Sequence, residues 1–157
     1  MSTTYVIKDH SGSKIPLKLW AGRDSTCMIF IGGSGDTKDT LSGLVNKSLE
    51  KLKYDFVTFS FVGAEEGKPY TLNRQTENLE TVLDYLIESK KYEELILVGT
   101  SDGAFSVCSV LVEERYSKLI SNVIFWILQT TIYRKAIARL GTSFGTDMSS
   151  IYRTLQL

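Results

Sequence analysis

The sequence predicts an α/β protein, a three-layer αβα sandwich with a mostly parallel sheet and an antiparallel hairpin at its N-terminal end. Strand patterns alternate with amphipathic helix patterns along most of the chain, which is typical of a parallel sheet covered by helices on both faces. Several strand patterns are continuously apolar, as expected of strands that are buried on both sides. The first two strand patterns are separated only by a short polar turn, which indicates a hairpin.

The N-terminal part contains the hairpin, one buried strand and one helix. Residues 3–9 (TTYVIKD) and 14–20 (KIPLKLW) flank a polar turn with Gly12, so they are the two predicted hairpin strands. The apolar run CMIFIGG, residues 27–33, predicts a strand that is buried on both faces. Residues 39–52 place leucine and valine side chains at helical spacing, which predicts a helix.

The alternation continues through the rest of the chain. Residues 55–62 are β-branched and aromatic and predict a strand, and residues 73–89 carry the apolar stripe of an amphipathic helix. A further buried strand is predicted at residues 94–99, followed by a helix at 103–116 and a strand at 121–129. Each helix connects two strands, which is the arrangement that parallel pairing requires.

One domain is expected to span residues 1–157, because the sequence contains no linker, internal repeat or low-complexity run. Residues 131–157 have the pattern of two short helices that are broken around Gly141 and Gly145.

Charge and composition exclude several classes of partner. The 18 basic and 18 acidic side chains cancel, so nothing favours nucleic acid or an anionic membrane surface. The longest apolar run is too short to span a bilayer, and the N-terminus lacks the pattern of a signal peptide. Cys27 and Cys108 lie in apolar runs without metal-ligand spacing, which indicates buried thiols in a reducing compartment. A cytoplasmic protein without a metal ion or other cofactor is therefore expected.

Three loops follow the carboxyl ends of predicted parallel strands, where such sheets bind ligands: residues 32–39, 63–70 and 99–103. The third contains GTSDG, the pattern G-x-S-x-G, directly after an apolar strand and before an apolar helix. Such a turn exposes the serine Oγ on a strained backbone, and small flanking residues let strand and helix pack closely. Ser101 is therefore a candidate nucleophile at a helix N-terminus. The alternative interpretation is an ordinary glycine-rich turn.

The first loop, IGGSGD at residues 31–36, offers a second backbone donor. Acyl transfer requires two N–H groups that converge on one oxygen atom, and the candidates are those of Ser34 and Asp102. Gly33 and Gly35 permit a close approach of the backbone. Neither G-K-[ST] nor a third spaced glycine follows, so both nucleotide-binding patterns fail. A plain strand–helix turn remains the alternative.

These motifs resemble the N-terminal two-thirds of the α/β-hydrolase fold superfamily. The similarity covers nearly the whole chain and includes the antiparallel first strands, GGSG at residues 32–35 and GTSDGA at 99–104. Gly32 stands where the family often has a histidine, and Val62 and Gly63 stand where it has an arginine–glycine pair. Neither difference removes a backbone oxyanion hole, although both weaken an analogy at the level of the substrate.

The resemblance implies a serine hydrolase that acts on an ester, thioester or amide of a small acyl substrate. It implies that Ser101 is the nucleophile and that the N–H groups of Ser34 and Asp102 hold the oxyanion. Residues expected beside the substrate are Gly33, Gly35 and Tyr70. Tyr70 follows Pro69 and lies either at the mouth of the pocket or on the surface of its loop.

The acid and the histidine of the family's catalytic triad follow the nucleophile in the chain. Here no histidine follows Ser101, and Asp147 is the one later acid with a plausible path to the site. His10 lies in the predicted hairpin turn, at the far edge of the sheet, where a solvated role is expected. The resemblance therefore implies a truncated fold in which residues 131–157 are similar to the start of a cap region. A serine without its base predicts weak or absent activity for the isolated chain.

A second function class stays open, a non-catalytic binding or interaction domain on the same scaffold. The strand NVIFWIL has no lysine, proline or inward charge that would discourage pairing. If no further strand covers this edge, self-association through it is expected.

Overall fold

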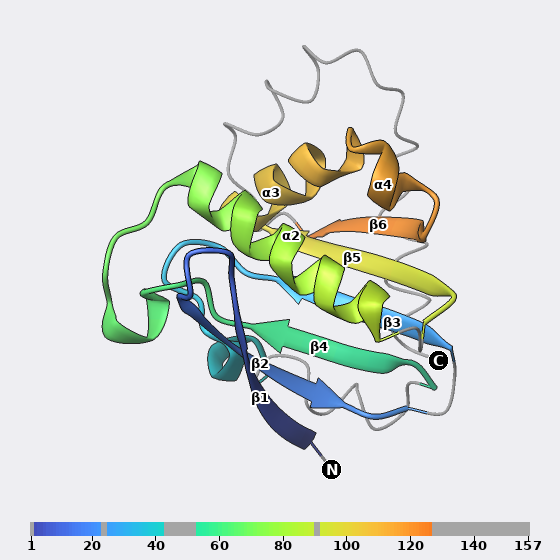
Figure 1. Cartoon of the computed structure of the whole chain (residues 1–157), viewed down its shortest axis with the longest axis horizontal. Coiled ribbons are helices and arrows are strands. Elements are labelled where there is room, and N and C mark those ends of the chain that lie inside the picture. Colours follow the sequence, from blue (N-terminus) through green and yellow to red (C-terminus); the bar gives the residue numbers. More distant parts are fainter. Residues whose placement is uncertain (1, 23–24, 43–52, 90–91, 127–157) are drawn as a thin grey trace. The chain divides into compact units, whose positions relative to one another are not determined.

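The structure, a computed structural model, describes residues 2–22, 25–42, 53–89 and 92–126, which contain one six-stranded mixed sheet (Figure 1). The strands are β1 (Ser2–Lys8), β2 (Lys14–Trp20), β3 (Thr26–Ile31), β4 (Asp55–Phe59), β5 (Glu94–Thr100) and β6 (Ile120–Trp126). Their order in the sheet is β1-β2-β4-β3-β5-β6. β1, β2 and β4 pair antiparallel, whereas β4, β3, β5 and β6 pair parallel. The predicted α/β fold, with a mostly parallel sheet and an N-terminal hairpin, is confirmed.

Asp9 organises the turn that joins β1 to β2. Its carboxylate accepts hydrogen bonds from the backbone N–H groups of Ser11 and Ser13, both at 2.9 Å. The buried carboxylate also forms an ion pair with Arg74, which is 65 positions later, in the first turn of α2 (Leu72–Glu88). The hairpin turn is therefore fixed to a helix that is distant in sequence.

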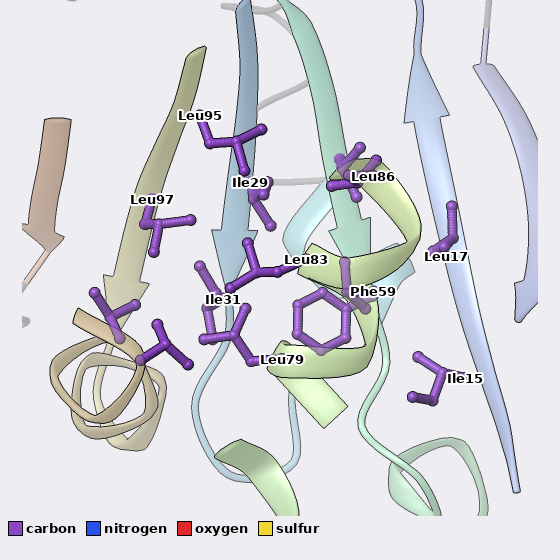
Figure 2. Packing of buried hydrophobic residues seen from close by; sticks show 14 of the residues in the cluster. Ile15, Leu17, Ile29, Ile31, Phe59, Leu79, Leu83, Leu86, Leu95 and Leu97 are labelled. Carbon is purple, nitrogen blue, oxygen red and sulfur yellow. The ribbon is translucent and has the colours of Figure 1, made fainter. Parts of the chain in front are cut away.

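Helices α2 and α3 (Asp102–Leu111) cover one face of the sheet (Figure 1). Figure 2 shows three leucines of α2 lying over the apolar side chains of the central strands. These contacts involve Leu79, Leu83 and Leu86 of the helix and Ile29, Ile31 and Phe59 of the strands. All six side chains are at most 3% exposed, so this side holds a continuous apolar core.

The opposite face of the sheet carries a second apolar cluster. Phe30 lies between two residues that face α2, so its side chain points to the other side. There it joins a cluster with Phe56, Val98 and Leu41. Leu41 belongs to the helical segment 38–42, which therefore packs on this second face.

The helix predicted at residues 103–116 is shorter than expected. α3 ends at Leu111, and a separate short helix, α4 (Glu114–Ser117), follows. Glu113 between them has the extended angles φ −84° and ψ 114°. This change of direction buries the ring of Tyr116 and lets its hydroxyl donate to Asp84 on α2, at 3.0 Å. Burial of one large aromatic ring outweighs the continuous helical periodicity of the segment.

Some predictions concern residues that the structure does not describe. They are the helix pattern beyond residue 42, the last residues of the strand at 121–129, and the whole of 131–157 with its similarity to a cap region. The single-domain prediction for residues 1–157 includes these segments and stays a prediction. Among the helices that are described, none combines the length and the apolar character that a membrane crossing requires.

Candidate active site

The ends of β3 and β5 bring two of the predicted loops together. The strands are parallel neighbours, and Ile31 at the end of β3 pairs with Gly99 near the end of β5. The loop after residue 31 and the turn after residue 100 therefore leave the same edge of the sheet side by side.

Ser101 occupies the turn between β5 and α3 and is exposed. Its backbone angles are φ 51° and ψ −125°, and no other non-glycine residue in the described part of the chain has a positive φ. L-amino acids rarely adopt such angles because the Cβ atom then crowds the backbone. The prediction of a strained turn that carries an exposed serine is confirmed.

Two glycines allow α3 to begin directly against the sheet. A Cβ atom on Gly103 would lie 2.4 Å from two carbonyl oxygens at the end of β3. A Cβ atom on Gly99 would lie 2.9 Å from the Cα atom of Ala104. Neither position accepts a side chain unless backbone atoms move. The G-x-S-x-G spacing thus has a steric cause, since backbone packs on backbone at both sides of Ser101.

Residues 33–36 form a type II β-turn. The Asp36 N–H donates to the Gly33 carbonyl oxygen at 3.2 Å, which closes the turn. Gly35, at the third position, has φ 82°, whereas Ser34 at the second position has a negative φ. This combination distinguishes type II from the other common turns, and it explains the glycine at the third position.

The turn touches Ser101 through Gly33. A Cβ atom built on Gly33 would lie 2.7 Å from the Cβ atom and 3.2 Å from the Oγ atom of Ser101. The backbone of the turn therefore approaches the serine side chain as closely as a glycine permits. The predicted loops at residues 32–39 and 99–103 are therefore in contact.

Nearly all backbone N–H groups of the turn have hydrogen-bond partners. Gly33 N–H donates to the Asp36 carboxylate at 2.8 Å, and Gly35 N–H donates to the Tyr70 hydroxyl at 3.0 Å. The N–H of Asp36 is used within the turn. The exception is Ser34, whose N–H has no partner among the residues that the structure describes.

Asp102 offers a second free N–H group. It is the first residue of α3, and the first N–H groups of a helix have no partner within that helix. No other described group accepts a hydrogen bond from it. The positive end of the helix dipole adds to the attraction that this N–H exerts on a negative charge.

Tyr70 lies in the loop between β4 and α2, after the short 3-10 helix η1 (Ala64–Glu66). It is half-buried, and its ring packs on Phe61 with the centroids 5.5 Å apart. Its hydroxyl accepts the hydrogen bond from Gly35 and donates a long one, 3.4 Å, to the Gly33 carbonyl oxygen. The described contacts of this hydroxyl are thus with the turn. Contacts of Tyr70, Gly33 and Gly35 with a substrate stay predictions.

A second group of contacts joins the loop at residues 32–39 to the loop at residues 63–70. Lys38 Nζ lies 2.6 Å from Glu65 Oε1 and 2.8 Å from Asp39 Oδ2, and Ser60 Oγ donates to Glu65 at 2.8 Å. Burial opposes the charges of Lys38 and Glu65, but hydrogen bonds within the cluster outweigh it. They raise the pKa of Lys38 and lower the pKa of Glu65. Both groups are therefore charged at neutral pH.

The described residues place no general base beside Ser101. Within the described ranges its Oγ makes no hydrogen bond to an imidazole or a carboxylate. His10 is exposed in the β1–β2 turn, and β1 is four strand positions from β5, about 19 Å at 4.8 Å per strand. Asp147 lies outside the described residues. No group of three His, Cys, Asp or Glu side chains in the described part has the arrangement of a metal site.

Three features of this region were not predicted correctly or at all. The role of Asp36 was not predicted, although an aspartate that bonds a nearby backbone N–H is a common turn signal. The Lys38–Glu65 pair was not predicted either, because the sequence offers no local signal for it. Cys108 was expected to be buried and is exposed, because it lies on the outer face of α3.

Comparisons with known proteins agree on the fold. No model of a protein family and no curated sequence matches this chain. An α/β-hydrolase fold protein of unknown function superimposes with a TM-score of 0.66 at 19% identity, over 80% of this chain and 43% of that one. An esterase from Pyrococcus furiosus gives 0.62 at 16% identity, over 78% and 50% of the two chains. Epoxide hydrolase A from Mycobacterium thermoresistibile gives 0.60 at 16% identity, over 89% and 45%. The chain thus spans about half the length of the structures that it resembles.

Proposed function

We propose that this chain, which has the α/β-hydrolase fold, is the nucleophile-bearing part of a serine hydrolase. The substrate class is an ester, thioester or amide of a small acyl group. Ser101 is the nucleophile, and the backbone N–H groups of Ser34 and Asp102 hold the oxyanion.

The contact between Gly33 and Ser101 is the observation that carries this proposal. Gly33 is the residue of the turn that contacts Ser101, and the unpaired N–H belongs to the next residue, Ser34. The unpaired N–H of Asp102 follows the serine directly. When Oγ bonds to a carbonyl carbon, an electron pair moves onto the carbonyl oxygen, and two such donors stabilise the resulting charge.

The proton of Ser101 needs a base that the described residues do not supply. A serine hydroxyl is barely ionised at neutral pH, and an oxyanion hole alone leaves only modest catalysis. We therefore expect the isolated chain to turn over short acyl esters at a rate near background. A base from outside the described residues, or from a second chain, would complete the site.

The alternative function is a non-catalytic binding or interaction domain. Phe105 on α3 and Val112 directly after it favour this alternative, because they expose apolar surface, at 47% and 82% exposure. On this alternative, Ser101 and the two free N–H groups bind a carbonyl or carboxylate group without reaction.

Modification by a fluorophosphonate probe tests the proposal. The expected result is slow phosphonylation of the wild-type chain at Ser101, located by peptide mass spectrometry, and none in Ser101→Ala. Ser34→Ala is the matched control, since it keeps the backbone N–H and should react at the wild-type rate. Gly33→Ala should block the reaction, because its Cβ atom would lie 2.7 Å from the Ser101 Cβ atom.

Other outcomes would separate the alternatives. Modification that spreads over several serines and persists in Ser101→Ala would contradict a nucleophilic role for this residue. Reversible binding of acyl compounds without any modification would support the binding domain. Fast ester turnover that Ser101→Ala abolishes would show that a base is present, and His10→Ala and Asp147→Ala would then identify it.

A further inference from the structure

We infer that Tyr70 is a positioning residue whose hydroxyl holds the turn at residues 33–36 in its type II form. In this form the N–H of Ser34 is the one donor of the turn that remains unpaired among the described residues. The link to the oxyanion rests on the proposed function, whereas the hold on the turn can be tested without it.

The amino acids of the turn permit type II but do not enforce it. Type I and type II turns differ mainly by a rotation of the central peptide, which here joins Ser34 to Gly35. Glycine adopts negative and positive φ about equally readily, so Gly35 permits both forms. Nothing lies within 4 Å of the position that a Gly35 Cβ atom would occupy, so packing against this residue does not select a form either.

The hydroxyl of Tyr70 favours the type II form of the turn over type I. It accepts the hydrogen bond of Gly35 N–H at 3.0 Å, and that N–H belongs to the peptide that would rotate. Rotation of this peptide would turn the N–H away from the hydroxyl and break the bond. The second contact, 3.4 Å to the Gly33 carbonyl oxygen, is too long to contribute much.

Tyr70 itself is held in place from several sides. Its ring packs on Phe61, and the next residue, Thr71, caps α2 by accepting the N–H of Arg74 at 3.2 Å. Upstream, Glu65 is fixed by its ion pair with Lys38. The hydroxyl therefore reaches the turn from a segment that is anchored before and after it.

Rotation of the central peptide would alter the site next to Ser101. The carbonyl of Ser34 and the N–H of Gly35 would exchange sides, which reverses the peptide dipole that adjoins the Ser34 N–H. A donor that faces a developing negative charge is sensitive to such a dipole, because the dipole belongs to the adjacent peptide group. Tyr70 would thus act on the oxyanion through the turn, independently of its predicted contact with the substrate.

NMR of the full chain distinguishes the two turn forms. Type II gives a strong NOE from the Ser34 Hα to the Gly35 amide proton, and type I gives a strong NOE between the two amide protons. We expect the first pattern in the wild type. Tyr70→Phe keeps the ring on Phe61 and removes the oxygen, so it should gain the second pattern and show faster exchange of the Gly35 amide proton.

Two further variants serve as controls. Tyr85→Phe removes the hydroxyl of a tyrosine that is 39% exposed on α2, and it should keep the wild-type pattern. Alanine disfavours the φ of 82° that Gly35 adopts, and its Cβ atom would meet no atom within 4 Å. Gly35→Ala should therefore shift the turn towards type I although Tyr70 is intact. If Tyr70→Phe keeps the wild-type NOE pattern and exchange rate, the inference is overturned.

The effect of Tyr70 on the proposed oxyanion site is measured by the rate of phosphonylation of Ser101. Tyr70→Phe should react about tenfold more slowly than the wild type, a smaller loss than removal of an oxyanion donor itself. If the turn changes but the rate does not, Tyr70 shapes the turn without serving the oxyanion, and this part of the inference fails. If even the wild type does not react at Ser101, the proposed function fails, and the NOE result still decides the role of Tyr70 in the turn.

Discussion

Replacement of Gly103 by alanine tests the packing that places Ser101 at the edge of the sheet. The new Cβ atom would lie 2.4 Å from two carbonyl oxygens at the end of β3 and 2.9 Å from the carbonyl carbon of Ile31. Ordinary contact begins at 3.4 Å, so the first turn of α3 must retreat from the sheet by about 1 Å. The obstructing atoms belong to the backbone of a central strand and cannot rotate aside.

Overpacking of a close-packed interior costs about 1–3 kcal/mol, and these rigid neighbours place Gly103→Ala at the upper end, at about 3 kcal/mol. Gly35→Ala is the matched comparison. It meets no atom within 4 Å but has φ 82°, so it carries only the conformational cost of about 1 kcal/mol. Each variant therefore carries one of the two costs, the steric cost in Gly103→Ala and the conformational cost in Gly35→Ala.

Urea unfolding measures both values. With a slope of about 2 kcal/mol per molar urea, the midpoint should fall by about 1.5 M for Gly103→Ala and by about 0.5 M for Gly35→Ala. A Gly103→Ala variant that is as stable as Gly35→Ala would refute the argument that backbone contact between α3 and β3 fixes the position of Ser101.

Two more predictions follow from the opposite ends of the sheet. Burial opposes ionisation of Asp9, but hydrogen bonds from Ser11 and Ser13 and the charge of Arg74 outweigh it and lower its pKa below the ordinary value of an aspartate. Its contribution to stability is therefore present above about pH 4 and is lost as the pH falls through the folded-state pKa. Asp9→Asn should cost about 2 kcal/mol at pH 7 and remove this part of the acid dependence, and an unchanged urea midpoint at pH 7 would contradict it. At the other end, β6 pairs with β5 and with no further described strand, so we expect the isolated chain to self-associate. A monodisperse monomer in light scattering at high concentration, with a cooperative melt, would count against this.

The parts of the fold that depend on local patterns were predictable from the sequence. β3 and β5 are continuously apolar because apolar clusters lie on both of their sides, and the spacing around Ser101 reflects backbone contacts of the two flanking glycines. The sheet order follows less directly, although a hairpin before alternating strands and helices already restricts it.

The parts that depend on distant partners were not predictable in this way. The role of Tyr70 in the turn depends on Gly35, which is 35 positions earlier, and Lys38 meets Glu65 across 27 positions. The end of α3 depends on the burial of Tyr116 against α2, which no local periodicity records. The exposure of Cys108 was missed for a related reason, since a helix that is apolar on all sides does not reveal which side faces the sheet.

The strained backbone at Ser101 lowers the stability of the folded chain in every molecule, whether or not a ligand is present. A non-glycine residue in such a conformation costs about 1–3 kcal/mol, which the packing of β5 and α3 around it has to offset. On the proposed function, the serine oxygen and the free N–H groups are arranged before a ligand arrives, so binding would not have to order them. Rigidity at this edge of the sheet thus lowers global stability, and we expect a chain with glycine at position 101 to be more stable and to lack the proposed nucleophile.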